Sequence, residues 1–375
     1  MTVTTAPTPA HTAYAVPTGM DFMAQPSPPI EMAQATKKIT EGHRRLKPSD
    51  LSSAAAHTAS KAPEKINTNH AISQPPSSGA RMNRGEPAHN DGTLGGMKIA
   101  FLGTGRMGTE LARHLLKNHE LTVWNRTAER AQPLVDAGAA LADSPTAAVE
   151  GAEVIITSLF GPDDIREQVI DTNLIPEGVT WIDTTTVSPE AAREFAAAVD
   201  SYVHAPVVGS LGPAREGKLG VYVGTPDDDR RELAMTIAEL WADENKLIGV
   251  ESAATAAIGK LLANLALAVT AEGVLEALHL GESEGLDSEV ILEMLDITGL
   301  AFMKNMKGPF ITGERNTTPG DFTVDALCKD AKLMEMTANK PLPAVAAAIE
   351  RFEEQQAMGH GDQDFSSIFV FRNKG

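Results

Sequence analysis

The sequence predicts an α/β fold class: a Rossmann-type doubly wound sheet, followed by an all-α domain and preceded by a disordered tail. Short apolar runs alternate with helical patterns from Met97 to about residue 251, whereas only helical patterns follow. Residues 1–96 show no sustained strand or helix periodicity. Because alternating strands and helices build a parallel sheet, we expect three parts, over residues 1–96, 97–251 and 252–375.

Seven strands are expected in the sheet part, each a short and largely apolar run. The run from Val154 to Leu159 is apolar over most of its length, which is typical of a parallel strand covered on both faces. In chain order, the expected strands are Ile99–Leu102, Leu121–Trp124, Val154–Leu159, Val179–Asp183, Tyr202–Ala205, Gly220–Val223 and Lys246–Val250.

The helical patterns change in character along the chain. Apolar residues recur at helical spacing just after the first strand, from Leu111 to Leu116. The acidic run Asp227-Asp228-Asp229 is expected at a helix N-terminus, where carboxylates favour the helix dipole. Residues 253–280 are predicted to form one long helix, apolar nearly all round and therefore buried. Further helices are expected near residues 128–137, 288–297, 324–338 and 344–356.

The first 96 residues differ in composition from the rest of the chain. They hold 11 of the 23 prolines and 5 of the 10 histidines, and they are rich in Ala, Ser and Thr. Such a composition buries too little apolar surface to offset chain entropy, which predicts disorder. Two interpretations stay open: a functional flexible tail, or a stretch upstream of a true start at Met97, which leads directly into the first strand.

Charge and cysteine content exclude several classes of protein. Residues 97–375 carry 43 acidic and 23 basic residues, a net charge of −20, so we expect no nucleic-acid partner. The single Cys328 rules out an intrachain disulfide and argues against a zinc site, so no metal is expected. The first residues do not resemble a secretory signal, and polar residues interrupt the most apolar stretch. We therefore expect a cytoplasmic protein with no membrane partner.

The strongest local signal is a glycine-rich turn, Gly103-Thr104-Gly105-Arg106-Met107-Gly108. It follows the first strand and opens a helix, which is the context that the GxGxxG dinucleotide-binding motif requires. The first glycine permits the tight turn, the second lets the backbone approach a pyrophosphate, and the third allows close helix–strand packing. The sequence therefore predicts a dinucleotide site in the 97–251 domain, with phosphates at the helix N-terminus.

The end of the second expected strand indicates which dinucleotide binds. NAD sites usually place Asp or Glu there, to accept hydrogen bonds from a ribose hydroxyl. This chain has Asn125-Arg126-Thr127 instead. Arg126 is a planar cation that can pair with a 2′-phosphate or stack on adenine. We expect a preference for NADP(H), with NAD(H) possible.

Lys260 and Asn264 lie four residues apart on the long apolar helix and so share one face. Burial lowers the pKa of an amine toward neutrality, which suits a general acid that protonates a carbonyl oxygen. A lysine whose stem packs in the helix while its ammonium reaches water is the alternative. Spacing alone leaves both interpretations open.

From Met97 to about Phe371 the chain resembles the β-hydroxyacid dehydrogenase family, which includes 3-hydroxyisobutyrate dehydrogenase, glyoxylate/succinic semialdehyde reductases and tartronate semialdehyde reductase. Four signatures match in order: the glycine turn ahead of Asn125-Arg126-Thr127, then Asp183-Thr184-Thr185-Thr186-Val187-Ser188-Pro189, then Ala205-Pro206-Val207-Val208-Gly209-Ser210, and then Gly259-Lys260-Leu261-Leu262-Ala263-Asn264. Phe322 and Lys329-Asp330 match a late pair of family positions.

The resemblance implies roles for these residues. Lys260 would be the general acid/base, and Asn264 would orient the lysine and the substrate. The substrate would also contact the loop Val208-Gly209-Ser210, whose Val208 replaces the serine of many members and leaves the exact substrate open. Met107, Leu159, Thr185 and Lys329 would line the nucleotide cleft. The family forms dimers and tetramers, so we expect a homodimer or homotetramer through the 252–375 domain.

The function expected first is hydride transfer between NADPH and a small carboxylate-bearing aldehyde or β- or γ-hydroxy acid. An imine reductase of the same architecture is one alternative, although such enzymes usually have Asp or Tyr at the position of Lys260. A non-catalytic NADP-binding module is the other, and a relative that lost its catalytic lysine is the model for it. The presence of both Lys260 and Asn264 favours an enzyme.

Overall fold

The computed structural model describes residues 96–372. Residues 1–95 lie outside this range, and so does the prediction of a disordered tail. The described part contains a nine-stranded sheet, and its strands are β1 (Lys98–Leu102), β2 (Glu120–Trp124), β3 (Ala140–Leu141), β4 (Val154–Thr157), β5 (Thr180–Asp183), β6 (Tyr202–His204), β7 (Val207–Val208), β8 (Leu219–Gly224) and β9 (Ala242–Val250).

Helices alternate with these strands and then continue alone. The helices of the sheet part are α1 (Arg106–Leu115), α2 (Gln132–Val135), α3 (Pro145–Val149), α4 (Pro162–Ile165), α5 (Pro189–Ala198), α6 (Leu211–Arg215) and α7 (Asp228–Ala238). The helices that follow are α8 (Ala253–Ser283), α9 (Ser288–Met294), α10 (Ala301–Ile311), α11 (Val324–Thr337), α12 (Pro343–Ala357) and α13 (Ser367–Val370). The predicted change from alternating to purely helical structure is confirmed.

The strand order is β3-β2-β1-β4-β5-β6-β8-β7, and β9 pairs with β8. Strands β1 to β6 pair in parallel, whereas β8 is antiparallel to β6 and β7. This is the doubly wound order, and the predicted fold class is confirmed. In such sheets ligands bind beyond the carboxyl ends of the strands, where the order reverses, here between β1 and β4.

All seven expected strands are present, with small shifts at their ends. The strand expected over Val154–Leu159 ends at Thr157, and the one expected from Lys246 begins at Ala242. Strands β3 and β7 and helices α3, α4, α5, α6, α10 and α13 were not expected. Each of the two strands has only two residues, and α10 contains Pro309, which ordinarily interrupts a helix.

The sheet is covered on both faces by apolar side chains. One core cluster joins Phe101 and Ile156 to Leu111 of α1, and a second joins Leu102 and Ile155 to helices on the opposite face. In the second cluster Trp181 packs on Tyr202 with ring centroids 4.6 Å apart. The alternating orientation of side chains along each strand distributes these residues between the two faces.

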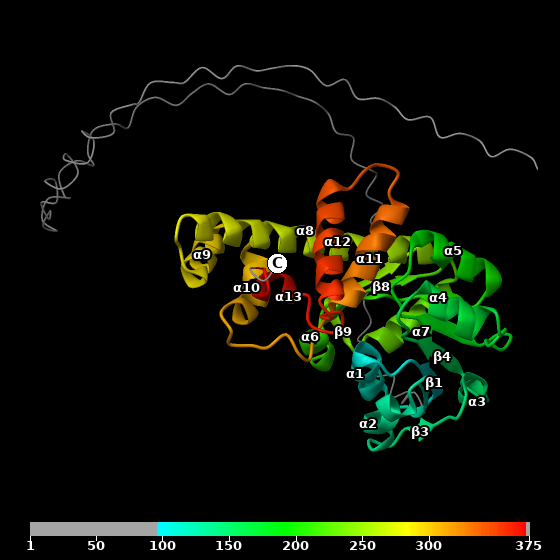
Figure 1. The fold of residues 1–375 in the computed structure, drawn as a ribbon. Helices are drawn as coiled ribbons and strands as arrows, with labels where there is room; N and C mark the ends of the chain where they lie inside the picture. The colour runs from blue at the N-terminus through cyan, green and yellow to red at the C-terminus, as the bar shows by residue number, and fades with distance from the viewer. Residues whose placement is uncertain (1–95, 373–375) are drawn as a thin grey trace, which may run out of the picture. The chain divides into compact units, whose positions relative to one another are not determined.

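Helix α8 connects the sheet part to the helical part. The Ser252 side chain caps its N-terminus by accepting a hydrogen bond from the Thr255 amide. A Cβ on Gly224 would lie 2.2 Å from the Ser252 carbonyl oxygen, so the glycine lets the end of β8 touch the start of α8. Farther along, α8 packs against α11 and α12, which run side by side (Figure 1). The predicted long helix is confirmed, but its predicted burial holds only in part, because Leu262 is 58% and Leu280 72% exposed.

Within residues 96–372, α8 is also the one helix that is long and apolar enough to cross a membrane by length and composition alone. Its buried residues pack within the described part of the chain: Ala253 and Ala257 join the core beneath the sheet, and Ala268, Val274 and Leu278 join the core of the helical part. A core helix of this kind meets the same criterion.

Candidate functional site

A cleft of about 430 Å³ opens at the carboxyl ends of β1, β4 and β5. The sheet part lines it with the glycine turn and with the segments that follow β2, β4 and β5. The helical part lines it with Lys260 of α8, the segment 321–323 and the first turns of α11. The cleft therefore lies where the strand order reverses, and both parts of the described chain build it.

The glycine turn forms a cradle for an anionic group. Gly103 has a φ of +100°, and a Cβ on it would lie 2.3 Å from the Ser158 carbonyl oxygen. A Cβ on Gly108 would lie 2.0 Å from the Gly103 carbonyl oxygen, so this glycine lets α1 pack onto the turn. A Cβ on Gly105 would meet nothing within 4 Å. The space beside Gly105 opens toward the cleft, at the α1 N-terminus, whose first amides have no partner inside the helix.

Asn125 ties the end of β2 to this turn. Its side-chain oxygen accepts a hydrogen bond from the Thr104 amide at 3.0 Å, and its side-chain amide donates to the Thr127 carbonyl oxygen at 2.8 Å. Thr104 is buried and positions the turn, whereas Asn125 and Thr127 line the cleft. The amide of Asn125 therefore serves the shape of the cradle.

Arg126 lies at the mouth of the cleft. Its side chain is 75% exposed, and its guanidinium is 3.6 Å from the carboxylate of Asp164. Arg130 lines the same part of the cleft. The cleft thus presents two arginines where an NAD site usually presents an acidic residue, and one of them faces a carboxylate from α4.

A buried polar cluster fixes the end of β5. The Asp183 carboxylate accepts hydrogen bonds from the Thr157 hydroxyl at 2.7 Å, the Tyr202 hydroxyl at 3.1 Å and the Thr185 amide at 3.0 Å. The Thr185 hydroxyl in turn accepts a bond from the Leu159 amide at 2.9 Å. Asp183 thereby connects the segments after β4 and β5, and it holds Thr185 and Leu159 at the cleft wall.

Lys260 points into the cleft from α8. Its residue is 7% exposed, and burial lowers the pKa of its ammonium to about 8, although Asp330 acts in the opposite direction. Its Nζ donates to the Asn264 side-chain oxygen at 3.3 Å and lies 5.9 Å from the centre of the Phe322 ring. The lysine is therefore enclosed, and it does not extend to bulk solvent as the alternative interpretation required.

Asp330 of α11 completes a chain of contacts behind this lysine. Its carboxylate accepts from the Asn264 side-chain amide at 2.6 Å and pairs with the Lys329 ammonium at 2.6 Å. The Lys329 ammonium also donates to the Thr186 carbonyl oxygen at 3.1 Å. Asn264 is thus held with its oxygen toward Lys260, and Lys329 spans the cleft from the helical part to the segment after β5.

The predicted substrate loop borders the same cleft as Lys260. Gly209 lines the cleft with a φ of +140°, and its neighbours in the wall are Val207 and Leu211. Val208 and Ser210 alternate with these residues and are not among those that line the cleft. Met107 and Leu159 line the cleft, and their contact with the nucleotide stays a prediction.

Sequence reasoning missed several residues of the cleft. Phe160 lies 5.5 Å from the Lys329 ammonium, measured to the ring centre, and is 56% exposed. Asp321, Asp325 and Asp362 line the helical side. An aromatic residue three positions after the end of β4 was a usable signal for Phe160, whereas nothing in the spacing of the three aspartates points to a shared site.

The fold and this cleft define a class of protein: an oxidoreductase that uses a nicotinamide dinucleotide. Residues 98–249 match the model described as the NAD binding domain of 6-phosphogluconate dehydrogenase. Residues 254–371 match the model described as NAD-binding of NADP-dependent 3-hydroxyisobutyrate dehydrogenase.

Individual relatives agree with these matches. The chain is 31% identical to an uncharacterized oxidoreductase of Shewanella frigidimarina, over 73% of this chain and 97% of that protein. It is 29% identical to glyoxylate/succinic semialdehyde reductase 1 of Arabidopsis thaliana, over 72% and 97%. A solved 3-hydroxyisobutyrate dehydrogenase of Mycobacterium tuberculosis with L-serine superposes with a TM-score of 0.65, at 26% identity, over 74% of this chain and 99% of that one.

The chain belongs to the β-hydroxyacid dehydrogenase family, as its motifs indicated. It is an NAD(P)-dependent hydroxyacid dehydrogenase of the 3-hydroxyisobutyrate dehydrogenase type, an oxidoreductase that acts on CH–OH donors. The residues of the cleft fit the nicotinamide cofactor, because the open space at Gly105 and the α1 N-terminus form a cradle for its pyrophosphate.

Two glycine substitutions separate the cradle from the packing of the turn. Gly105→Ala places a methyl group where no protein atom lies within 4 Å, so the fold should persist while NADPH binds about tenfold more weakly, a loss of about 1.4 kcal/mol. Gly108→Ala must displace backbone and should lower both the melting temperature and the affinity. NADPH fluorescence titration and thermal melting check both. Unchanged NADPH affinity in Gly105→Ala would contradict the placement of the pyrophosphate.

Proposed function

We propose that this protein transfers hydride between NADP(H) and a small carboxylate-bearing aldehyde or hydroxy acid, with Lys260 as the general acid/base. The observation that carries the proposal is the position of Lys260: its ammonium is buried in the cleft that holds the glycine turn. The bound nicotinamide would supply or accept the hydride. In reduction, the ammonium of Lys260 donates a proton to the carbonyl oxygen as that oxygen becomes an alkoxide, and the products are the alcohol and the oxidised cofactor.

Neighbouring residues support this role of Lys260. Asn264 accepts a hydrogen bond from the ammonium and is itself held by a hydrogen bond to Asp330. These contacts fix the orientation of the Lys260 ammonium. The pKa of about 8 lets Lys260 exist in both protonation states near neutral pH, as a residue needs if it gives and takes a proton. The backbone amides of Gly209 and its neighbours in the cleft wall would bind the substrate carboxylate, because backbone N–H groups bind anions without a further charge.

Replacing Lys260 tests the proton transfer. Lys260→Met should lower kcat by about 10²- to 10⁴-fold while NADPH still binds. Lys260→Arg keeps the charge but does not deprotonate, so it should be nearly as inactive. Lys332→Met on α11, where Lys332 pairs with Glu353 at the surface, is the matched control. A panel of glyoxylate, succinic and methylmalonic semialdehydes and one cyclic imine, with NADPH and NADH, measures the activity.

The pH profile gives the same test a direction. Burial sets the pKa of Lys260 at about 8, below its ordinary 10.5. Reduction needs the protonated form, so kcat/KM for reduction should be level below pH 8 and fall above it. Oxidation needs the neutral amine and should rise toward pH 8 and then level. Full activity of Lys260→Arg would reject the proton-transfer role, and NADPH binding without turnover of any substrate would favour a non-catalytic module.

The preference for NADP(H) rests on Arg126. The guanidinium at the mouth of the cleft can pair with a 2′-phosphate, and Arg130 adds a second cation nearby. The carboxylate of Asp164, 3.6 Å from Arg126, opposes that pairing.

Two substitutions should therefore move the cofactor preference in opposite directions. Arg126→Ala should raise the KM for NADPH about tenfold or more and change the KM for NADH little, since it removes a charge-assisted hydrogen bond to one cofactor alone. Asp164→Asn leaves Arg126 unopposed and should increase the preference for NADPH. Steady-state kinetics with both cofactors decides. Equal losses with NADPH and NADH in Arg126→Ala would mean that the arginine stacks on adenine.

We also propose that the protein is a homodimer or homotetramer. Large apolar side chains are exposed on contiguous elements at the far end of α8: Leu280 is 72% exposed, Ile297 96% and Phe302 72%. Exposed apolar surface of this kind is typical of protein interfaces.

The mass of the protein in solution tests the proposed homodimer or homotetramer. Light scattering after gel filtration should give two or four times the chain mass of 39.7 kDa. The double variant Ile297→Glu, Phe302→Glu should lower that mass without unfolding the chain, whereas Leu141→Glu, a 43% exposed apolar residue on β3, should not. A monomeric wild-type protein would contradict the proposal.

A further inference from the structure

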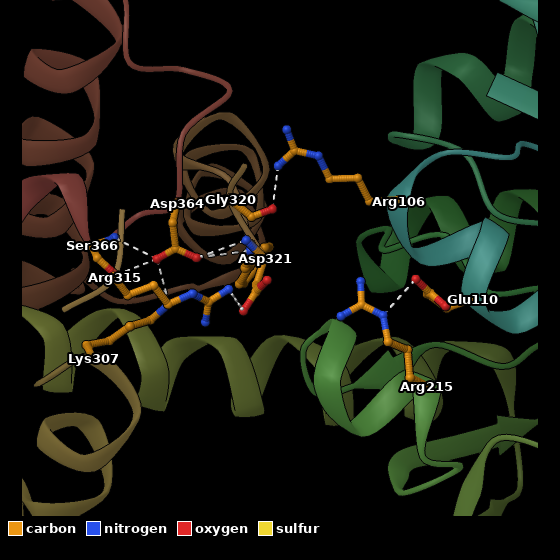
Figure 2. A network of polar contacts seen from close by, with 10 residues as sticks. Arg106, Glu110, Arg215, Lys307, Arg315, Gly320, Asp321, Asp364 and Ser366 are labelled. Atoms are coloured by element: carbon orange, nitrogen blue, oxygen red, sulfur yellow. Dashed lines mark hydrogen bonds and ion pairs between the residues drawn. The ribbon is translucent and has the colours of Figure 1, made fainter. Parts of the chain in front are cut away.

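Arg106 is the one side chain of the glycine turn that bonds to the helical part, among residues 96–372. It is the first residue of α1, yet its guanidinium donates to the Gly320 carbonyl oxygen and, at 3.2 Å, to the Asp362 carbonyl oxygen. These partners are 214 and 256 residues farther along the chain. Figure 2 shows the arginine extending from α1 toward Gly320. The glycine motif itself requires no side chain at this position.

The segment that Arg106 reaches is held rigidly from the other side. We call residues 320–322 the 320–322 loop. The buried carboxylate of Asp364 accepts hydrogen bonds from the Asp321 amide at 3.1 Å and the Phe322 amide at 3.3 Å. The same carboxylate pairs with the ammonium of Lys307 at 2.6 Å, and both of these side chains are buried (Figure 2). Breaking a buried ion pair of this kind is costly, so the loop is a firm anchor.

The 320–322 loop carries residues that face the chemistry. Asp321 and Phe322 line the cleft, and the Phe322 ring centre lies 5.9 Å from the Nζ of Lys260. Arg106 therefore joins the turn that holds the cofactor phosphates to the loop that borders the proposed proton donor. Both partners of Arg106 are carbonyl oxygens on separate segments. A planar guanidinium can contact both with different nitrogens, whereas an ammonium has only one nitrogen.

We propose that Arg106 is a positioning residue that latches the cofactor-binding turn to the 320–322 loop and so holds Phe322 over the nicotinamide end of the cleft. This inference rests on the proposed function. The cofactor phosphates are bound by the backbone of the turn, and the side chain of Arg106 acts on the loop. The side chain of Arg106 therefore affects the binding of the nicotinamide half of the cofactor and of the substrate beside Lys260.

A cofactor fragment distinguishes this role from a direct phosphate contact. The fragment 2′-phospho-ADP-ribose carries the pyrophosphate and the 2′-phosphate but lacks nicotinamide. In the full-length chain, Arg106→Met and Arg106→Lys should both lower the affinity for NADPH about tenfold. The affinity for the fragment should stay within twofold of that of the wild type, as measured by fluorescence titration. Arg215→Met is the matched control, because Arg215 pairs with Glu110 of α1 within the sheet part at 3.0 Å (Figure 2), and it should bind both like the wild type.

Two results of this titration would overturn the latch. Restored NADPH binding in Arg106→Lys would show that charge alone suffices. An equal loss for the fragment in Arg106→Met would show that Arg106 contacts the pyrophosphate. These titrations need no turnover, so the latch and the proposed reaction can fail independently of each other.

A double-mutant cycle tests the path through Phe322. Arg106→Met should lower kcat/KM for the aldehyde about tenfold in the wild-type background and much less in Phe322→Leu, because the loop then has no aromatic ring to position. Additive losses in the double variant would overturn the coupling to Phe322. Thermal melting of each variant shows whether the fold is retained, and a melting temperature for Arg106→Met close to that of wild type is expected because Arg106 is exposed.

Discussion

The site depends on keeping one ammonium group out of water on an apolar helix. Lys260 lies in a helix whose buried residues are mostly Ala and Leu, and an isolated buried charge is expensive. The structure offsets that cost without a direct carboxylate contact: Asn264 accepts from the ammonium, and Asp330 holds Asn264. Because the carboxylate of Asp330 contacts Lys260 only through Asn264, burial has the larger effect, and the pKa of Lys260 falls to about 8. A carboxylate placed directly on Lys260 would have kept it protonated.

The position of Lys260 in the cleft also depends on where helix α8 begins. Lys260 lies two turns into α8, so its position follows from the contact of the α8 N-terminus with β8. Gly224 permits that contact, since any Cβ there would meet the Ser252 carbonyl oxygen, and Ser252 caps the helix. The contact with β8 thereby fixes the position of Lys260 relative to the glycine turn. Helix α11 brings Lys329 and Asp330 to the same cleft.

Periodicity and glycine spacing predicted the parts of this molecule that are determined locally. The strands β1, β2, β4, β5, β6, β8 and β9, the turn at Gly103, and the shared face of Lys260 and Asn264 all follow from residues close together in sequence. The two-residue strands β3 and β7 carry no period, and α10 contains a proline that argues against a helix. The bonds of Asp330 to Asn264 and of Arg106 to Gly320 join residues 66 and 214 positions apart. No single-sequence pattern specifies such contacts.

The acidic surface does not prevent the binding of an anionic cofactor and an anionic substrate, because charge acts over short distances in salt solution. At physiological ionic strength, exposed charges farther away than about 8 Å are largely screened, so the net charge of −18 matters less than the groups in the cleft. There the positive end of α1 and the cations Arg126, Lys260 and Lys329 line the cleft. Asp164 and Asp330 are each paired with one of these cations. On the helical side of the cleft, Asp321 pairs with Arg315, and Asp325 accepts a hydrogen bond from the Gln356 side chain. The cleft can therefore attract anions while the surface as a whole keeps the protein strongly negative.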